Sequence, residues 1–166
     1  MKLLLTGANG YIGMRLLPIL LDRGPQVVCL VRARARFPFD NFRDTLTSPD
    51  QLEVIEGDLL QAESLSAIPG DIEAAYYLVH SMGSGASNFY DLEQTSAENF
   101  VAALAHTEAR HIIYLSGIVN HPKSELSPHL ASRLNVEEIL HRAPLPAPVL
   151  RAALIVGAGS ASIEII

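Results

Sequence analysis

The chain has 166 residues, 49% hydrophobic and 18% charged, which is enough apolar sequence to fold around a core of its own. Its formal net charge of −6 disfavours nucleic acid or an anionic membrane surface as the main partner. No apolar run approaches the ~20 residues of a membrane-spanning helix, and the single cysteine, Cys29, rules out an intrachain disulfide. We therefore expect one globular, cytoplasmic domain without a membrane anchor.

Strand and helix signals alternate along the whole chain. Short runs that are apolar on both faces predict strands, and longer stretches with apolar residues at helical spacing predict helices. The predicted strands are Leu3–Leu5, Gln26–Val31, Leu52–Ile55, Ala74–Val79, His111–Leu115 and Ala147–Val156. The predicted helices are Tyr11–Leu21, the short Ala62–Ile68, Phe89–His106, and one that Ser127 caps and that runs to about Arg142.

The remaining segments have no clean period. Arg32–Asp50 contains two prolines and predicts a loop with a short helix near Asn41–Leu46, while His80–Asn88 predicts a loose loop and Ser160–Ile166 a helix just beginning. Strands that alternate with helices predict a parallel sheet covered on both faces. Right-handed crossovers then give the doubly wound strand order 3-2-1-4-5-6 in a single α/β domain.

The stretch Thr6–Gly13, TGANGYIG, joins the first strand to the first helix. Gly7 allows a sharp turn off the strand, Gly10 lets a pyrophosphate approach the backbone, and Gly13 lets the helix pack closely on the sheet. The free N–H groups at the start of the helix, together with its dipole, suit a phosphate. This stretch therefore predicts a dinucleotide site; the alternative is an ordinary tight turn.

The spacing Gly7-x-x-Gly10-x-x-Gly13 resembles the extended and atypical branches of the short-chain dehydrogenase/reductase superfamily, and the chain looks similar to bacterial NAD(P)H-binding and NmrA-like proteins. The resemblance implies a Rossmann fold over residues 1–166, with the substrate lobe absent or truncated after residue 157. It also implies an apolar surface around Ile155–Ile166 that would favour a homodimer or be covered by further chain. The cofactor contacts that it implies at the turn are Gly7, Asn9, Gly10, Tyr11, Ile12 and Gly13.

The end of the second strand bears on the choice of cofactor. NAD-preferring folds place an acid there to bind the ribose 2′-hydroxyl, whereas this chain has Arg32, followed by Arg34 and Arg36. A guanidinium suits a 2′-phosphate, so NADP(H) is the preferred cofactor and NAD(H) the alternative. The competing interpretation of these arginines is a solvated basic loop.

Two further segments match the family beside the cofactor. Asp58 and Leu59, in Gly-Asp-Leu after the third strand, match the position where relatives accept a hydrogen bond from the adenine amino group; a carboxylate that caps the following turn is the alternative. Val79 and His80 end the fourth strand, where relatives pass along the ribose and pyrophosphate. A structural role for His80 is the alternative to contact with cofactor or substrate.

The catalytic set of the family is degenerate in this chain. Classical members use Tyr-x-x-x-Lys and a serine, with the tyrosine hydroxyl as general acid. The matching helix places His129 at the tyrosine and Arg133 at the lysine, four residues apart on one face, and Ser116 stands slightly early for the serine. The resemblance implies that Arg133 holds a ribose, while His129 is a candidate proton donor.

Other chemistries have little support in the sequence. The six histidines form no metal-binding pattern, and there is neither a nucleophile elbow nor a phosphate-binding Gly-Lys-Ser/Thr loop. Arg151, in VLRAALIVGAG, matches a family segment beside the nicotinamide, but a structural ion pair is an equal reading. Two functions stay open: an NADPH-dependent oxidoreductase on a small carbonyl, enone or quinone, and a non-catalytic dinucleotide-binding redox sensor that acts through a partner. A nucleotide-sugar epimerase or dehydratase is less favoured because those relatives keep Tyr-x-x-x-Lys.

Overall fold

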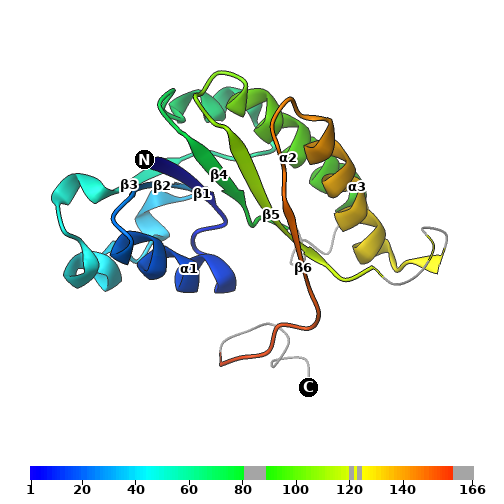
Figure 1. The fold of residues 1–166 in the computed structure, drawn as a ribbon, viewed down its shortest axis with the longest axis horizontal. Coiled ribbons are helices and arrows are strands. Elements are labelled where there is room, and N and C mark those ends of the chain that lie inside the picture. The colour runs from blue at the N-terminus through cyan, green and yellow to red at the C-terminus, as the bar shows by residue number, and fades with distance from the viewer. Residues whose placement is uncertain (81–88, 120–121, 123–124, 159–166) are drawn as a thin grey trace.

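The computed structural model describes residues 1–80, 89–119, 122 and 125–158. Its described strands form one parallel sheet in the order β3-β2-β1-β4-β5-β6, which confirms the predicted doubly wound fold (Figure 1). The strands are β1 (Lys2–Thr6), β2 (Gln26–Val31), β3 (Leu52–Glu56), β4 (Ala74–Tyr77), β5 (His111–Gly117) and β6 (Val149–Ala152). The α-helices are α1 (Tyr11–Asp22), α2 (Phe89–Leu104) and α3 (Pro128–Arg142).

The two faces of the sheet carry separate hydrophobic cores because successive side chains of a strand point to opposite sides. Leu3, Leu5 and Cys29 pack against α1 on one face. Leu4 and Phe100 belong to the core on the other face, which α2 and α3 cover (Figure 1). Burial raises the pKa of the Cys29 thiol to about 12, so this cysteine stays protonated and serves as apolar filling.

The segment between β2 and β3 is more regular than the sequence predicts. Three 3₁₀ turns occupy it, at Arg34–Arg36, Phe39–Thr45 and Pro49–Gln51, so the short helix expected at Asn41–Leu46 begins two residues earlier. Phe37 and Phe42 stack with ring centroids 5.7 Å apart and are both buried. Their burial against the α1 face of the sheet supplies the order that the loop-like composition does not reveal.

The sixth strand is shorter than predicted. Ala147–Val156 is apolar except for Arg151, but β6 ends at Ala152 because its partner strand β5 ends at Gly117, with which Ala152 is paired. Beyond that pairing the apolar side chains are open to solvent, with Leu154 69% and Val156 58% exposed. The helix expected at Ser160–Ile166 lies outside the described residues, and association through this apolar surface stays a prediction.

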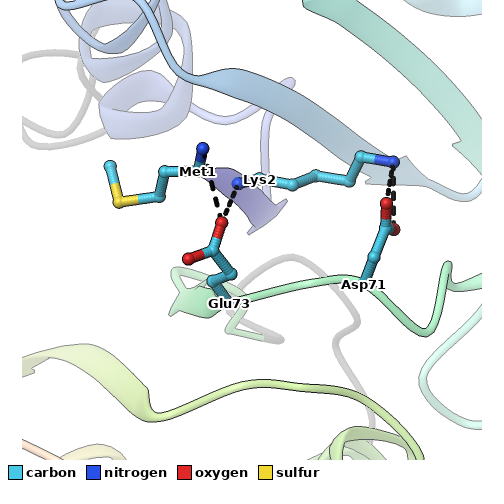
Figure 2. Close-up of polar contacts among 4 residues, drawn as sticks. All are labelled: Met1, Lys2, Asp71 and Glu73. Atoms are coloured by element: carbon cyan, nitrogen blue, oxygen red, sulfur yellow. Dashed lines mark hydrogen bonds and ion pairs between the residues drawn. The ribbon is translucent and has the colours of Figure 1, made fainter.

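The amino end of β1 is tied to the turn that leads into β4 (Figure 2). Glu73 accepts a hydrogen bond of 3.0 Å from the backbone N–H of Lys2 and pairs with the N-terminal ammonium at 3.3 Å, while Lys2 Nζ pairs with Asp71 at 2.7 Å. These contacts lower the pKa of both carboxyl groups. They hold β1 in register with β4, and that register brings the carboxyl end of β1 beside Leu78.

Candidate functional site

The turn between β1 and α1 has the backbone geometry that its glycines predict. Gly7 has a φ of +66°, and a Cβ at this residue would lie 2.8 Å from the carbonyl oxygen of Leu78. A Cβ at Gly13 would collide with the backbone of Gly7 and Ala8. Both residues must therefore be glycine for the turn to fold and for α1 to pack on it.

Gly10 differs from its two neighbours because its missing side chain leaves space outside the turn. Its φ of −82° suits any residue, and among the described residues an added Cβ would meet only the carbonyl oxygen of Gly7 within 4 Å, at 3.2 Å. The first α-helical bond that involves this turn runs from the N–H of Met14 to the carbonyl of Gly10, at 2.9 Å. No side chain caps α1 and its first turn holds no acid, so the amides there face an open position suited to an anion.

The Tyr11 side chain turns toward the segment after β6. The Arg15 guanidinium lies 3.7 Å from the centre of the Tyr11 ring, and its Nη2 donates to the carbonyl of Ala158 at 2.7 Å. The Tyr11 hydroxyl sits so close to Gly157 that any Cβ there would collide with it. Of the residues expected to contact cofactor, Asn9 and Gly10 are exposed at the turn, and Tyr11 and Ile12 are half-buried.

The carboxyl ends of β2 and β3 lie side by side, and an acid that the sequence analysis did not consider stands there. Glu56 pairs with Val31 across the strands, and its Oε2 accepts a hydrogen bond of 2.8 Å from the N–H of Arg34. Arg32 and Arg34 are both exposed. The Glu56 carboxylate therefore holds the basic turn in place. The sequence could have indicated this contact only through the register of β2 and β3, which pairs Glu56 with Val31 just before the turn.

Asp58 and Leu59 follow β3 and have local roles of their own. Asp58 Oδ1 accepts from the N–H of Leu60 at 3.0 Å, which caps the turn, while its N–H donates to Ser64 Oγ at 2.9 Å. The Leu59 side chain is buried in the core on the α2 face. Oδ1 of Asp58 thus caps the turn, and a hydrogen bond from the adenine amino group to Oδ2 stays a prediction.

His80, His129 and Arg133 meet at the carboxyl ends of β4 and β5, although His80 lies far from the other two in the sequence. The rings of His80 and His129 lie 6.4 Å apart, and Phe89 lies 5.9 Å from His129. Arg133 Nε donates to His129 Nε2 at 3.3 Å, and Arg133 Nη1 donates to the carbonyl of Leu115 at 3.1 Å. The expected cluster of His129 and Arg133 on one face of α3 is therefore present, with His80 beside it.

Both imidazoles of this cluster are neutral at pH 7. Desolvation of the ring, then the charge of Arg133 and the neighbouring His129, lower the pKa of His80 to about 4. His80 keeps exposed surface, so water screens part of this effect. Desolvation and then Arg133 also lower the pKa of His129. Because His129 Nε2 accepts from Arg133, its proton resides on Nδ1.

Ser116 and Val79 lie near the cluster but point into the core. Ser116 is buried on β5, and its Oγ has no hydrogen-bond partner of good geometry among the described residues. Burial raises the pKa of the neighbouring Tyr114 phenol to about 12, and Arg133 and then Ser116 oppose part of this rise. Val79 packs against the core of the α2 face. Neither side chain is directed at the open glycine turn.

Arg151 has a structural partner. It forms a hydrogen-bonded ion pair with Glu137 of α3, whose side chain is only 7% exposed, against 49% for Arg151. The pair joins β6 to α3 and supports the structural reading of this arginine. It also leaves Glu137 dependent on one cation for its charge compensation.

Removal of Arg151 is expected to lower stability. Arg151→Ala leaves the buried Glu137 carboxylate unpaired, so the midpoint of urea unfolding falls. The double variant Arg151→Ala with Glu137→Gln should recover part of that loss, because it removes the buried charge. A double variant no more stable than Arg151→Ala would show that the unpaired Glu137 carboxylate is not the cause of the lost stability.

The described residues contain neither a metal centre nor a membrane span. No group of three or more His, Cys, Asp or Glu in residues 1–80, 89–119, 122 and 125–158 is placed to hold a metal ion. Among the same residues no helix is long and apolar enough to cross a membrane. A hollow of about 510 Å³ lies at the β2–β3 side, lined in part by Lys2, Arg34 and Phe37, away from the histidine cluster.

Comparison with known proteins agrees with the geometry of the turn. A family model described as NAD(P)H-binding matches residues 7–151. The chain is 29% identical over 125 residues to 3 beta-hydroxysteroid dehydrogenase/Delta 5-->4-isomerase of Mycobacterium tuberculosis, which covers 69% of this chain and 31% of that protein. The chain thus spans less than a third of the length of the curated relatives it matches.

Two solved structures illustrate the likeness of fold. The Bordetella bronchiseptica enzyme WbmH in complex with NAD+ superposes with a TM-score of 0.76 at 21% identity, over 99% of this chain and 60% of that one. Citrobacter sp. triphenylmethane reductase complexed with NADP(H) superposes with a TM-score of 0.68 at 24% identity, over 93% of this chain and 50% of that one. Both cofactors thus occur among proteins of this fold.

Proposed function

The chain belongs to the NAD(P)H-binding family, and from this premise we propose that it is the cofactor domain of an NADPH-dependent oxidoreductase acting on a small carbonyl or quinone. The observation that carries the proposal is the open position in front of Gly10. There the amides of the first turn of α1 have no capping side chain, and that turn contains no acidic residue. A pyrophosphate in that position would direct the nicotinamide toward β4 and β5.

The basic turn after β2 supports NADPH as the preferred form. Arg32 follows β2 directly and is exposed, and Glu56 holds the N–H of Arg34 and so fixes the turn beside it. A guanidinium at this place can pair with a 2′-phosphate, and the nearby carboxylate opposes that pairing. The proposed preference therefore depends on Arg32 outweighing Glu56.

Arg32→Ala is expected to weaken NADPH binding by about ten- to a hundredfold and NADH binding little, because a charge-assisted contact contributes on the order of 1.5–3 kcal/mol. Glu56→Gln keeps an acceptor for Arg34 but removes the opposing charge, so it should strengthen NADPH binding. Arg43→Ala, an exposed arginine paired with Asp40, is the matched control. Fluorescence titration with both reduced cofactors measures this, and tighter NADH binding by the wild-type chain would refute the preference.

A non-catalytic redox-sensing module is the second candidate, and one observation favours it. His129 aligns with the tyrosine of the family, but its Nε2 accepts a hydrogen bond from Arg133. The proton on Nδ1 of a neutral imidazole is a weak acid, and Arg133 stays charged, so neither residue is an efficient general acid. A panel of carbonyls and quinones, with NADPH oxidation followed by absorbance, separates the two candidates. Turnover of any panel member supports the oxidoreductase, whereas tight NADPH binding without turnover supports the module.

A further inference from the structure

Arg133 is a half-buried cation with only neutral partners. Its two hydrogen bonds within the described chain go to the imidazole of His129 and the carbonyl of Leu115. A guanidinium has five N–H donors, so three remain for another acceptor. Among the described residues no carboxylate lies within ion-pair distance of it. The chain has a formal net charge of −6, yet Arg133 has no ion-pair partner in the part of the chain that the structure describes.

Aromatic rings gather beside Arg133. His80, His129 and Phe89 contribute three rings, with neighbouring centroids 5.9–6.4 Å apart. Both imidazoles are neutral at pH 7. An anion in this place would therefore bind to Arg133 and not to the histidines, and the neutral rings can contact a planar apolar group. A cation at the edge of one ring, with two further rings beside it, can recognise a planar acid: the rings contact its body and the fork of the guanidinium binds its carboxylate.

The cofactor's phosphates belong at another place. The pyrophosphate position lies over the turn after β1, and β1 and β5 are separated by β4 in the sheet. Two strand spacings amount to roughly 9–10 Å, so Arg133 stands on the side of the uncharged nicotinamide ribose and of the substrate. A ribose hydroxyl can accept from the guanidinium but does not neutralise it.

We propose that Arg133, flanked by the rings of His80, His129 and Phe89, binds the carboxylate of a planar organic acid, which makes the substrate of this domain an acid-bearing carbonyl or quinone compound. That this acid is a substrate rests on the proposed function, whereas its binding to Arg133 does not depend on turnover. It assigns to Arg133 the choice of substrate and leaves cofactor selection to the turn after β2.

The test uses benzoate as probe and benzyl alcohol as its uncharged counterpart, with NMR detection of the histidine ring protons across pH. Benzoate is expected to raise the pKa of His80 and His129, because a carboxylate beside Arg133 offsets the charge that lowers them, while His106, far along the chain, serves as internal reference. Benzyl alcohol should produce no such rise. Equal effects of the two probes, or none, would overturn the proposal without any variant.

Variants sharpen the assignment to Arg133. Arg133→Gln should weaken benzoate binding by about ten- to a hundredfold, as expected for loss of a charge-assisted contact. Arg142→Gln removes the same charge from the far end of α3, where Arg142 pairs with Glu138 at 3.9 Å, and should leave binding unchanged. Equal losses in both variants would mean that only net charge matters and would contradict a site at Arg133.

Addition of saturating NADP+ separates the two sources of an anion. If benzoate still binds in its presence, the carboxylate belongs to a second ligand, as proposed. If NADP+ displaces benzoate and by itself raises the pKa of both histidines, Arg133 serves a cofactor phosphate and the proposal is wrong. Failure of the chain to bind NADPH would instead refute the proposed function, and the benzoate titration would still stand or fall by itself.

Discussion

Gly10→Val is expected to abolish binding of NADPH and NADH while the far-ultraviolet circular dichroism spectrum stays close to that of the wild type. The backbone at Gly10 has an ordinary φ of −82°, and an added Cβ meets just the carbonyl of Gly7, at 3.2 Å, within the part of the chain that the structure describes. The side chain would instead fill the open position where the pyrophosphate approaches the amides. Loss of two charge-assisted hydrogen bonds, at about 1.5–3 kcal/mol each, corresponds to at least a hundredfold in affinity.

Two further variants control for folding. Gly10→Ala adds the smallest side chain at the same place and should also lose most of the affinity. Gly70→Ala, where the nearest atom to an added Cβ is the carbonyl of His106 at 3.6 Å, should bind cofactor normally. Titration of the reduced cofactors by fluorescence compares the three. Unchanged affinity in a folded Gly10→Val protein would place the phosphates elsewhere and refute the dinucleotide site.

Reduction of simple ketones by the wild-type chain is expected to be slower than reduction of quinones by a factor of roughly 10²–10⁴, the usual contribution of a general acid. His129, which the sequence motif aligns with the tyrosine of the family, is neutral, with Nε2 engaged by Arg133, and Arg133 stays charged at every accessible pH. Neither group therefore has a proton held ready for a ketone oxygen. Quinones need little protonation during hydride transfer and avoid this deficit.

Substitution of His129 separates this interpretation from the opposite one. His129→Ala is expected to change NADPH binding and quinone turnover little, because the imidazole neither carries charge nor donates a proton to the acceptor. Steady-state NADPH oxidation with matched ketones and quinones, run on wild type and variant, provides the measurement. Brisk ketone reduction that collapses in His129→Ala would identify His129 as the acid and overturn this prediction.

Several features of the fold were readable from the sequence because they are local or periodic. The alternation of apolar runs with helical stretches predicted the strands of the sheet and the α-helices that the structure describes. The right-handedness of the crossovers predicted the strand order. Ser127 does cap α3, with its Oγ accepting from the N–H of Leu130 at 3.3 Å. The prediction was wrong in two places where composition misleads. β6 is shorter than predicted because its partner strand β5 ends at Gly117, and the segment after β2 is ordered by buried aromatic side chains.

The site divides in the same way. The glycine turn was predictable from its motif, because the spacing of the three glycines is itself the signal. Gly13 is required by the backbone of Gly7 and Ala8 within the turn, whereas the contact that excludes a side chain at Gly7 comes from Leu78 on the neighbouring strand segment. Glu56 beside Arg34, Glu137 beside Arg151, and His80 beside His129 are pairs 14 to 49 residues apart with no pattern that links them. Only the parallel register and the packing of α3 on β5 bring such residues together. The sequence by itself thus determined the sheet and the dinucleotide turn, and the tertiary structure decided which charges face one another at the carboxyl edge, because contact between distant residues depends on how the elements pack and leaves no periodic signal.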